Sequence, residues 1–204
     1  MIAIIDYDAG NIRSVEKALR LLGEEPCVTR NIEEIRKADE VILPGVGSFG
    51  DAMENLRSFG LVSAISEAVR EGKPFLGICL GLQLLFEKSE ESPGAEGLGI
   101  LKGVIKRIPD GADRKVPHMG WNSLHLQNNG RLFAGVKEQS YVYFVHSYYL
   151  EAADESIVTA TTGYGVTIHA SVEQGNVFAC QFHPEKSSDV GLTILKNFAA
   201  LAGK

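Results

Sequence analysis

The stretch PFLGICLGLQLLFEK, residues 74–88, predicts a strand that runs directly into a helix. Residues 74–78 form a short apolar run typical of a buried parallel strand, and residues 80–88 follow as a helix. Cys79 stands at the junction, framed by Gly77 and Gly81. This order of strand, sharp turn and helix is typical of an α/β fold that presents one side chain at the carboxyl edge of its sheet.

Strands and helices continue to alternate on the N-terminal side of this stretch, and strands dominate after it. The pattern predicts strands at 2–6, 26–29 and 40–45 and helices at 12–22, 32–37 and 61–71. Beyond residue 88 it predicts strands at 99–108, 141–150 and 156–162, a hairpin over 168–183 that turns at 174–176, and a helix at 189–202. We therefore predict a single α/β domain, residues 1–204. It has an open, mostly parallel sheet with helices on both faces and an antiparallel strand addition in the second half.

Composition narrows the class of protein. Of the 204 residues, 45% are hydrophobic and 23% charged, which suits a globular chain, and the formal net charge of -6 disfavours nucleic-acid binding. No apolar run reaches the roughly 18 residues of a membrane span. The N-terminus lacks the basic segment of a secretory signal. Three cysteines without such a signal predict free thiols in the cytoplasm, with Cys27 and Cys180 as core residues.

Cys79 is the candidate nucleophile. A thiol at a helix N-terminus is favoured as thiolate, and the backbone N–H of Leu80 would point toward a developing oxyanion. The alternative is a buried structural cysteine at a strand end, because cysteine is commonly buried. The strand before Cys79 and the helix after it favour the catalytic interpretation.

His183 and Glu185 are the candidate base and its orienting group. Residues i and i+2 of an extended chain project to the same side, and Pro184 between them favours that extended geometry. The alternative is a charged pair on a surface turn. Among the other histidines, His146 is a candidate pocket residue, and His118 is expected in a loop; His125 and His169 are expected on half-exposed strands. No Cys/His cluster has metal-ligand spacing, so we expect no metal and no cofactor.

Five motifs together resemble a known family. In chain order they are DYDAGN (6–11), PGVGSFG (44–50), GICLGLQLLFE (77–87), KVPHMGWN (115–122) and FHPEKSS (182–188). The second, third and fifth resemble class I, triad-type glutamine amidotransferases, which have a flavodoxin-like sheet. The other two resemble the glutaminase subunits of imidazole glycerol phosphate synthases, enzymes of histidine biosynthesis. The resemblance covers essentially the whole chain.

The resemblance implies a role for each matching residue. Cys79 would attack the side-chain amide of L-glutamine, His183 would relay the proton, and Glu185 would orient His183. The oxyanion hole would use the N–H of Leu80 and one from Val46 or Gly47. In the family that stretch can present a carbonyl until a peptide flips, which flanking glycines make easy. The glutamine site would be lined by Gln83, by Glu91 at the α-ammonium, and by His146, Ser147 and Tyr148.

The resemblance also implies a partner. The ammonia would pass into a cyclase subunit with a (β/α)8 barrel, in a heterodimer that makes imidazole glycerol phosphate and aminoimidazole carboxamide ribotide. Asn11, Trp121 and Lys186 would face this cyclase. A lone tryptophan is more often a core residue, but its Pro/Gly/Asn-bounded segment favours a surface anchor. Asp8 departs from the glycine common in the family, on the expected partner face.

Three alternatives remain at this point. One is a glutaminase subunit of another triad amidotransferase, which would share the triad but lack HMGWN. Another is a non-catalytic receiver-like signalling module, with Asp6 and Asp8 as its acidic pocket; it leaves GICLG and HPE unexplained. The last is a cysteine hydrolase that acts alone.

Overall fold

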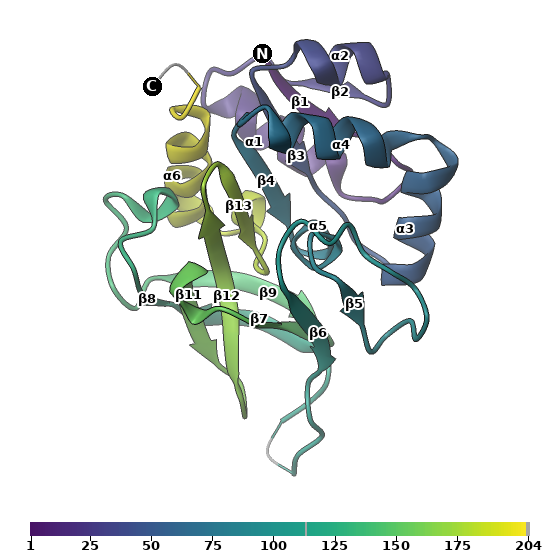
Figure 1. Ribbon diagram of the computed structural model, residues 1–204. Helices are drawn as coiled ribbons and strands as arrows, with labels where there is room; N and C mark the ends of the chain where they lie inside the picture. The colour runs from purple at the N-terminus through teal and green to yellow at the C-terminus, as the bar shows by residue number, and fades with distance from the viewer. Residues whose placement is uncertain (113, 203–204) are drawn as a thin grey trace.

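A computed structural model describes residues 1–112 and 114–202. Its central sheet has eight strands in the order β2-β1-β3-β4-β13-β12-β11-β8 (Figure 1). The pairs from β2 to β13 are parallel and those from β13 to β8 antiparallel. The eight strands are β1 (Ile2–Ile5), β2 (Cys27–Thr29), β3 (Glu40–Leu43), β4 (Phe75–Ile78), β8 (His125–Leu126), β11 (Val158–Gly163), β12 (Thr167–Gln174) and β13 (Val177–Cys180). This confirms the predicted α/β class, a mostly parallel sheet with an antiparallel addition.

Helices cover both faces of this sheet. They are α1 (Ile12–Leu21), α2 (Ile32–Lys37), α3 (Phe49–Ser58), α4 (Leu61–Arg70), α5 (Leu80–Leu84) and α6 (Ser188–Ala199), with 3-10 turns at Arg131–Phe133, Glu155–Ile157 and Pro184–Lys186. The side chains of β1 alternate between two cores: Ile2 and Ile4 pack with α1 and α6, whereas Ala3 and Ile5 pack with α2, α3 and α4. Buried on both faces, β1 reads as an unbroken apolar run, as expected of a parallel strand.

The second half of the chain also forms two smaller sheets, drawn in the lower half of Figure 1 beside β11 and β12. Their strands are β5 (Lys88–Ser89), β6 (Gly103–Arg107) and β10 (Tyr148–Ala152) in one, and β7 (His118–Ser123) and β9 (Tyr141–His146) in the other. The single strand predicted over 141–150 is therefore wrong, because the chain changes sheets at Ser147. His118 lies on β7 instead of in a loop, paired with His146 of β9.

Two helix predictions also need correction. The helix expected over 80–88 ends at Leu84, because residues 88–89 leave it to pair with β6 as strand β5. Helix α3 was missed, although its signals are present: Ser48 accepts a hydrogen bond from the N–H of Asp51, and Phe49, Ala52, Met53 and Leu56 are buried at helical spacing.

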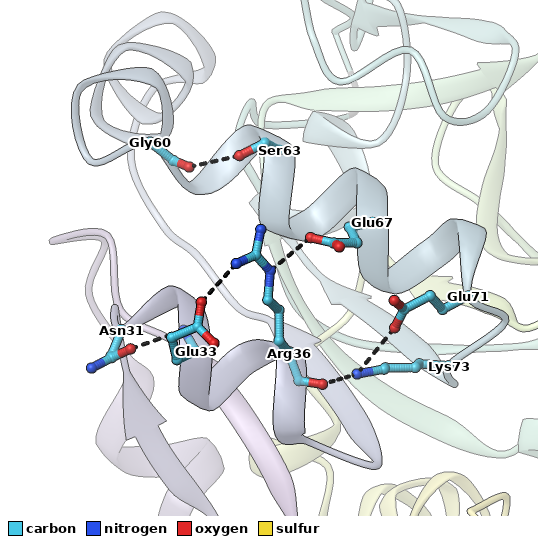
Figure 2. A network of polar contacts seen from close by, with 8 residues as sticks. All are labelled: Asn31, Glu33, Arg36, Gly60, Ser63, Glu67, Glu71 and Lys73. Atoms are coloured by element: carbon cyan, nitrogen blue, oxygen red, sulfur yellow. Dashed lines mark hydrogen bonds and ion pairs between the residues drawn. The ribbon is translucent and has the colours of Figure 1, made fainter.

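A polar network on the surface ties α2 to α4 (Figure 2). The Arg36 guanidinium donates to Glu33 of its own helix and to Glu67 of α4, at 2.6 and 2.8 Å. Lys73 binds the carbonyl oxygen of Arg36 and lies 3.4 Å from the Glu71 carboxylate. Exposed ion pairs of this kind contribute little stability each, so the network mainly fixes the relative position of two helices.

Cys180 and Cys27, both predicted to be core residues, differ in burial. Cys180 is fully buried as predicted, but Cys27 is only half-buried on edge strand β2, with its thiol 3.8 Å from the Glu34 carboxylate. The prediction of a core position for Cys27 is therefore wrong.

Over residues 1–112 and 114–202, no helix is long and apolar enough to cross a membrane.

Candidate active site

Cys79 occupies a strained turn between β4 and α5. Its φ of 56° and ψ of -108° lie outside the regions that most side chains adopt. A Cβ at Gly81 would overlap the carbonyl oxygen of Leu43, so the helix packs against β3 only because that residue is glycine. The strain and the close packing are those expected of a nucleophile elbow, and they hold the thiol at the carboxyl edge of the sheet.

His183 and Glu185 form a buried pair at the same edge. Nδ1 of His183 lies 2.7 Å from Oε1 of Glu185, and the two side chains are 1% and 0% exposed. A carboxylate can only accept, so Nδ1 carries the proton and Nε2 has a free lone pair. Within residues 1–112 and 114–202, Nε2 is buried and makes no hydrogen bond. The pair is therefore no surface turn, and its imidazole is set to accept a proton.

The charge on His183 depends on its two neighbours. Burial by itself lowers the pKa of this imidazole. Contact with the Cys79 sulfur and with Glu185 outweighs burial and raises that pKa to about 10. The raised pKa means that His183 holds a proton firmly when both neighbours are negative, which favours transfer of the thiol proton to Nε2.

Asn11 supports this pair, a contact that the sequence did not suggest. Its side-chain amide donates to Oε1 of Glu185 and lies 3.5 Å from Nδ1 of His183. Asn11 has a φ of 73° before the first turn of α1, a conformation that asparagine tolerates better than most residues. We expected Asn11 on the partner face, and the structure places its side chain against Glu185 and His183.

For the glutamine hydrolysis that the motifs predict, Asn11→Gly is expected to lower kcat about tenfold, the worth of one hydrogen bond to a charged group. Glycine keeps the left-handed backbone while removing the donor to Glu185. The measurement is steady-state glutaminase kinetics at saturating cyclase subunit, with Asn129→Gly, another residue at positive φ, as control. A variant with normal kcat and only weaker cyclase binding would make Asn11 an interface residue alone.

A cavity of about 260 Å³ opens beside Cys79. It brings together the predicted oxyanion-hole and glutamine-binding residues from segments far apart in sequence. Besides Cys79, its lining residues are Val46, Gly47, Leu80, Gln83, Glu91, Val145, His146, Ser147 and Tyr148. Val145 is the one member that the sequence analysis missed; nothing in an apolar strand marks which residue borders a pocket.

Two members of this lining already have partners. One carboxylate oxygen of Glu91 accepts from the N–H of Phe49 at 2.8 Å, at the first turn of α3. The N–H of Leu80 donates to the carbonyl oxygen of Gly45 at 3.3 Å. One expected donor of the oxyanion hole therefore faces a backbone carbonyl in this conformation.

His146 belongs to a hydrogen-bonded chain that reaches β7. Its Nδ1 donates to the carbonyl oxygen of Tyr148 at 2.8 Å, and its Nε2 lies 3.0 Å from Nδ1 of His118. Because a carbonyl only accepts, Nε2 of His146 is the acceptor and His118 is the donor. Burial lowers the pKa of His118 to about 4, and burial with the nearby His118 and His183 lowers that of His146 to about 3. Both rings are therefore neutral near pH 7.

The lowered pKa values of His118 and His146 predict a loss of stability on acidification. In the unfolded chain each histidine titrates near 6.5. Below that pH, down to about 4, only the unfolded chain binds protons at His118 and His146, so stability falls on acidification. The effect of His183 on stability runs in the opposite direction, because its pKa is raised. The stabilisation that it gives to the folded chain is complete below pH 6.5 and is lost as pH rises toward 10. We expect Tm to drop by at least about 5 °C between pH 7 and 4.5. The drop should be smaller in His118→Gln, which has no imidazole to protonate at this position. An equal drop in both chains would show that His118 does not cause the acid sensitivity.

The remaining predicted interface residues share one surface. Trp121 lies on β7 and is 52% exposed, so it is no core residue. Its ring packs edge-on against Tyr143, and the Lys186 ammonium lies 5.9 Å from the centre of that same ring. The N–H of His183 donates to the carbonyl oxygen of Tyr143 at 2.9 Å. The surface that carries Trp121 and Lys186 is therefore connected to His183 through the backbone of Tyr143.

The acidic residues after β1 do not form an open pocket. Arg30 binds both of them, at 2.9 Å from Asp6 and 2.6 Å from Asp8. Among the residues that the structure describes, no group of three or more His, Cys, Asp or Glu side chains is placed to hold a metal ion. Asp6 and Asp8 therefore do not form the acidic pocket of a receiver-like module.

Comparison with known proteins identifies the family. Residues 3–201 match the family described as "Glutamine amidotransferase class-I". The chain is 53% identical over 198 residues to the imidazole glycerol phosphate synthase subunit HisH of Bacillus cereus (strain G9842), covering 97% of this chain and 93% of that protein. The chain belongs to the class-I glutamine amidotransferases. HisH of Moorella thermoacetica is 54% identical over 200 residues, 98% of this chain and 94% of that protein.

A solved structure of a glutamine amidotransferase has the same fold. A chain titled "Crystal structure of glutamine amidotransferase" superposes with a TM-score of 0.77 at 24% identity, and the match covers 100% of both chains. The family match and the HisH relatives confirm the family predicted from the motifs and exclude the receiver-like module as the class of this protein.

Proposed function

We propose that this chain hydrolyses L-glutamine to glutamate and ammonia with Cys79, His183 and Glu185, and delivers the ammonia to the cyclase subunit of an imidazole glycerol phosphate synthase. The observation that supports it most strongly is the strained Cys79 elbow, which borders the cavity beside the buried His183–Glu185 pair. The names of the HisH relatives support the assignment to this synthase.

The reaction follows from the positions of these side chains. The Cys79 thiol gives its proton to Nε2 of His183, and the thiolate attacks the side-chain amide carbon of glutamine. When the tetrahedral intermediate collapses, the amide nitrogen takes that proton from His183 and leaves as ammonia, and a thioester remains on Cys79. Water then gives a proton to His183 and attacks the thioester, so that glutamate leaves and the thiol re-forms.

The cavity lining supplies groups for the rest of the substrate. Glu91 carries a carboxylate toward which the α-ammonium of glutamine is attracted, and its contact with the N–H of Phe49 fixes that carboxylate in place. Gln83, His146, Ser147 and Tyr148 line the remaining wall, and Val46 and Gly47 border the side on which an oxyanion would form. Working as a thiolate, Cys79 suits a reducing, cytoplasmic location.

The proposed partner is a (β/α)8-barrel cyclase in a heterodimer, bound through the surface of Trp121 and Lys186 with Asn11 beside it. Exposed Met119 and Tyr141, on β7 and β9, give this side further apolar area. Solvent-exposed tryptophan with apolar neighbours is typical of an interface anchor. Asp8, where glycine is common in the family, forms an ion pair with Arg30.

Trp121→Ala is expected to weaken the complex with the cyclase subunit roughly 30-fold, as removal of an anchor residue does. Its side chain is half exposed, so the Tm of the free chain should stay the same. Calorimetric titration measures the Kd. Leu21→Ala, which truncates an exposed apolar side chain of α1, is the matched control. An unchanged Kd for Trp121→Ala would contradict the proposed surface.

The proposed function is tested by measuring ammonia and glutamate released from L-glutamine, with and without a cyclase subunit and its nucleotide substrate. Without the nucleotide substrate we expect the two products in equal amounts; with cyclase subunit and nucleotide substrate, glutamate should exceed free ammonia because the cyclase consumes the ammonia. L-Asparagine should not react, because its amide is one methylene short of Cys79 when the α-ammonium is held at Glu91. Release of ammonia from neither amino acid under any of these conditions would overturn the proposal.

A further inference from the structure

Gln181 lies beside Cys79 and has no role so far. Strands β13 and β4 pair in parallel, with Cys180 opposite Ile78, and the N–H of Cys79 donates to the carbonyl oxygen of Cys180 at 2.8 Å. Cys79 and Gln181 are the next residues of the two strands, so the sheet places them side by side at its carboxyl edge. Gln181 is 0% exposed and does not line the cavity, so its buried amide is not a substrate contact.

The Gln181 amide points its nitrogen at the nucleophile. Nε2 lies 3.7 Å from Sγ of Cys79, within reach of an N–H···S hydrogen bond. Its oxygen accepts from Nε2 of Gln83 at 3.0 Å. A buried amide with both ends occupied in this way is held in a single orientation.

A backbone carbonyl decides this orientation. Nε2 of Gln83 lies 3.1 Å from the carbonyl oxygen of Tyr148, which can only accept, so the nitrogen and oxygen of Gln83 are not interchangeable. The same nitrogen faces Gln181, which must therefore present its oxygen to Gln83 and its nitrogen to Cys79. Both N–H bonds of Gln83 are thereby used, and only its carbonyl oxygen is left to accept from a ligand in the cavity.

We propose that Gln181 is a further catalytic residue, whose side-chain N–H stabilises the thiolate of Cys79. The inference rests on the proposed function in taking Cys79 as the nucleophile. In the step concerned, the thiol proton moves to Nε2 of His183 and the S–H electron pair stays on sulfur, where the N–H of Gln181 faces the new charge. A hydrogen bond to the charged form favours that form, and the Gln83–Tyr148 chain keeps the donor from turning away.

The test is the pH dependence of Cys79 alkylation by iodoacetamide, followed by peptide mass, in the free chain and in Gln181→Met. Methionine keeps the shape of glutamine and removes the donor. We expect the midpoint of the profile to rise by about one pH unit, with alkylation about tenfold slower on the acidic side of both midpoints. Gln181→Glu keeps the acceptor for Gln83 and places a carboxylate beside the sulfur, so its midpoint should rise further.

Two comparisons separate this role from a structural one. Gln127→Met removes a glutamine that bonds Thr161 on strand β11, and its Cys79 profile should match the wild type. In Gln181→Met, glutamine turnover should recover as pH rises, whereas a packing defect lowers it equally at every pH. An unchanged alkylation midpoint in either Gln181 variant overturns the proposal. If the midpoint shifts in Gln181→Met but the wild-type chain hydrolyses no glutamine, only the proposed function is overturned.

Discussion

Cys79→Ala is expected to abolish glutamine-dependent synthesis by the complex with the cyclase subunit, by at least roughly 10⁴-fold, while synthesis from free ammonium continues. The structure gives the reason: within residues 1–112 and 114–202, no other thiol lines the cavity. Without Sγ no thioester forms, and His183 has no proton to take. Ammonium bypasses this site because it enters the reaction as the product of the step that is lost.

The control is Cys27→Ala, which makes the same chemical change at a half-buried thiol on β2. It should leave both glutamine-dependent and ammonium-dependent synthesis at the wild-type rate. Far-ultraviolet circular dichroism and Tm show whether the Cys79→Ala chain is folded; we expect it to be, since the change removes only the sulfur atom, which borders a cavity. Glutamine-dependent turnover that survived in a folded Cys79→Ala chain would show that Cys79 is not the nucleophile.

The parts of the site that could be predicted are those written in short motifs. The elbow follows from one strand, one cysteine and one helix within a dozen residues, and His183 and Glu185 lie two residues apart. The alternating pattern of the first half likewise predicts parallel strands, because each is buried on both faces and reads as an apolar run. Local periodicity is enough for these elements.

Contacts between distant segments could not be predicted in this way. Asn11 meets Glu185, which is 174 residues away, and Gln83 meets Gln181 across 98 residues. Such pairs depend on which strands are neighbours in the sheet, and one sequence does not specify that order. The break at Ser147 was missed for a related reason: an unbroken run of aromatic and β-branched residues suits one strand as well as two that belong to different sheets.

One donor of the proposed oxyanion hole is occupied in this conformation, and this geometry predicts strong activation by the proposed partner. The N–H of Leu80 is occupied by the carbonyl oxygen of Gly45, 3.3 Å away. Rotation of the Gly45–Val46 peptide plane would withdraw this carbonyl and turn the N–H of Val46 toward the cavity. Gly47, with a φ of 113°, and the exposed Val46 side chain leave room for the rotation.

We therefore expect glutamine hydrolysis by the isolated chain to be about 10²–10³-fold slower than in the complex with cyclase subunit and nucleotide substrate, the usual effect of one oxyanion-hole donor. Glutamate formation under the two conditions measures it. Alkylation of Cys79 by iodoacetamide is the control, because that displacement forms no oxyanion and should change little when the partner binds. If the partner accelerates both reactions equally, it acts on the thiolate instead; if the isolated chain is already fully active, the carbonyl of Gly45 does not restrain catalysis. A large increase in hydrolysis with steady alkylation places the activation after thiolate formation, as expected if the partner frees the N–H of Leu80 from the carbonyl oxygen of Gly45.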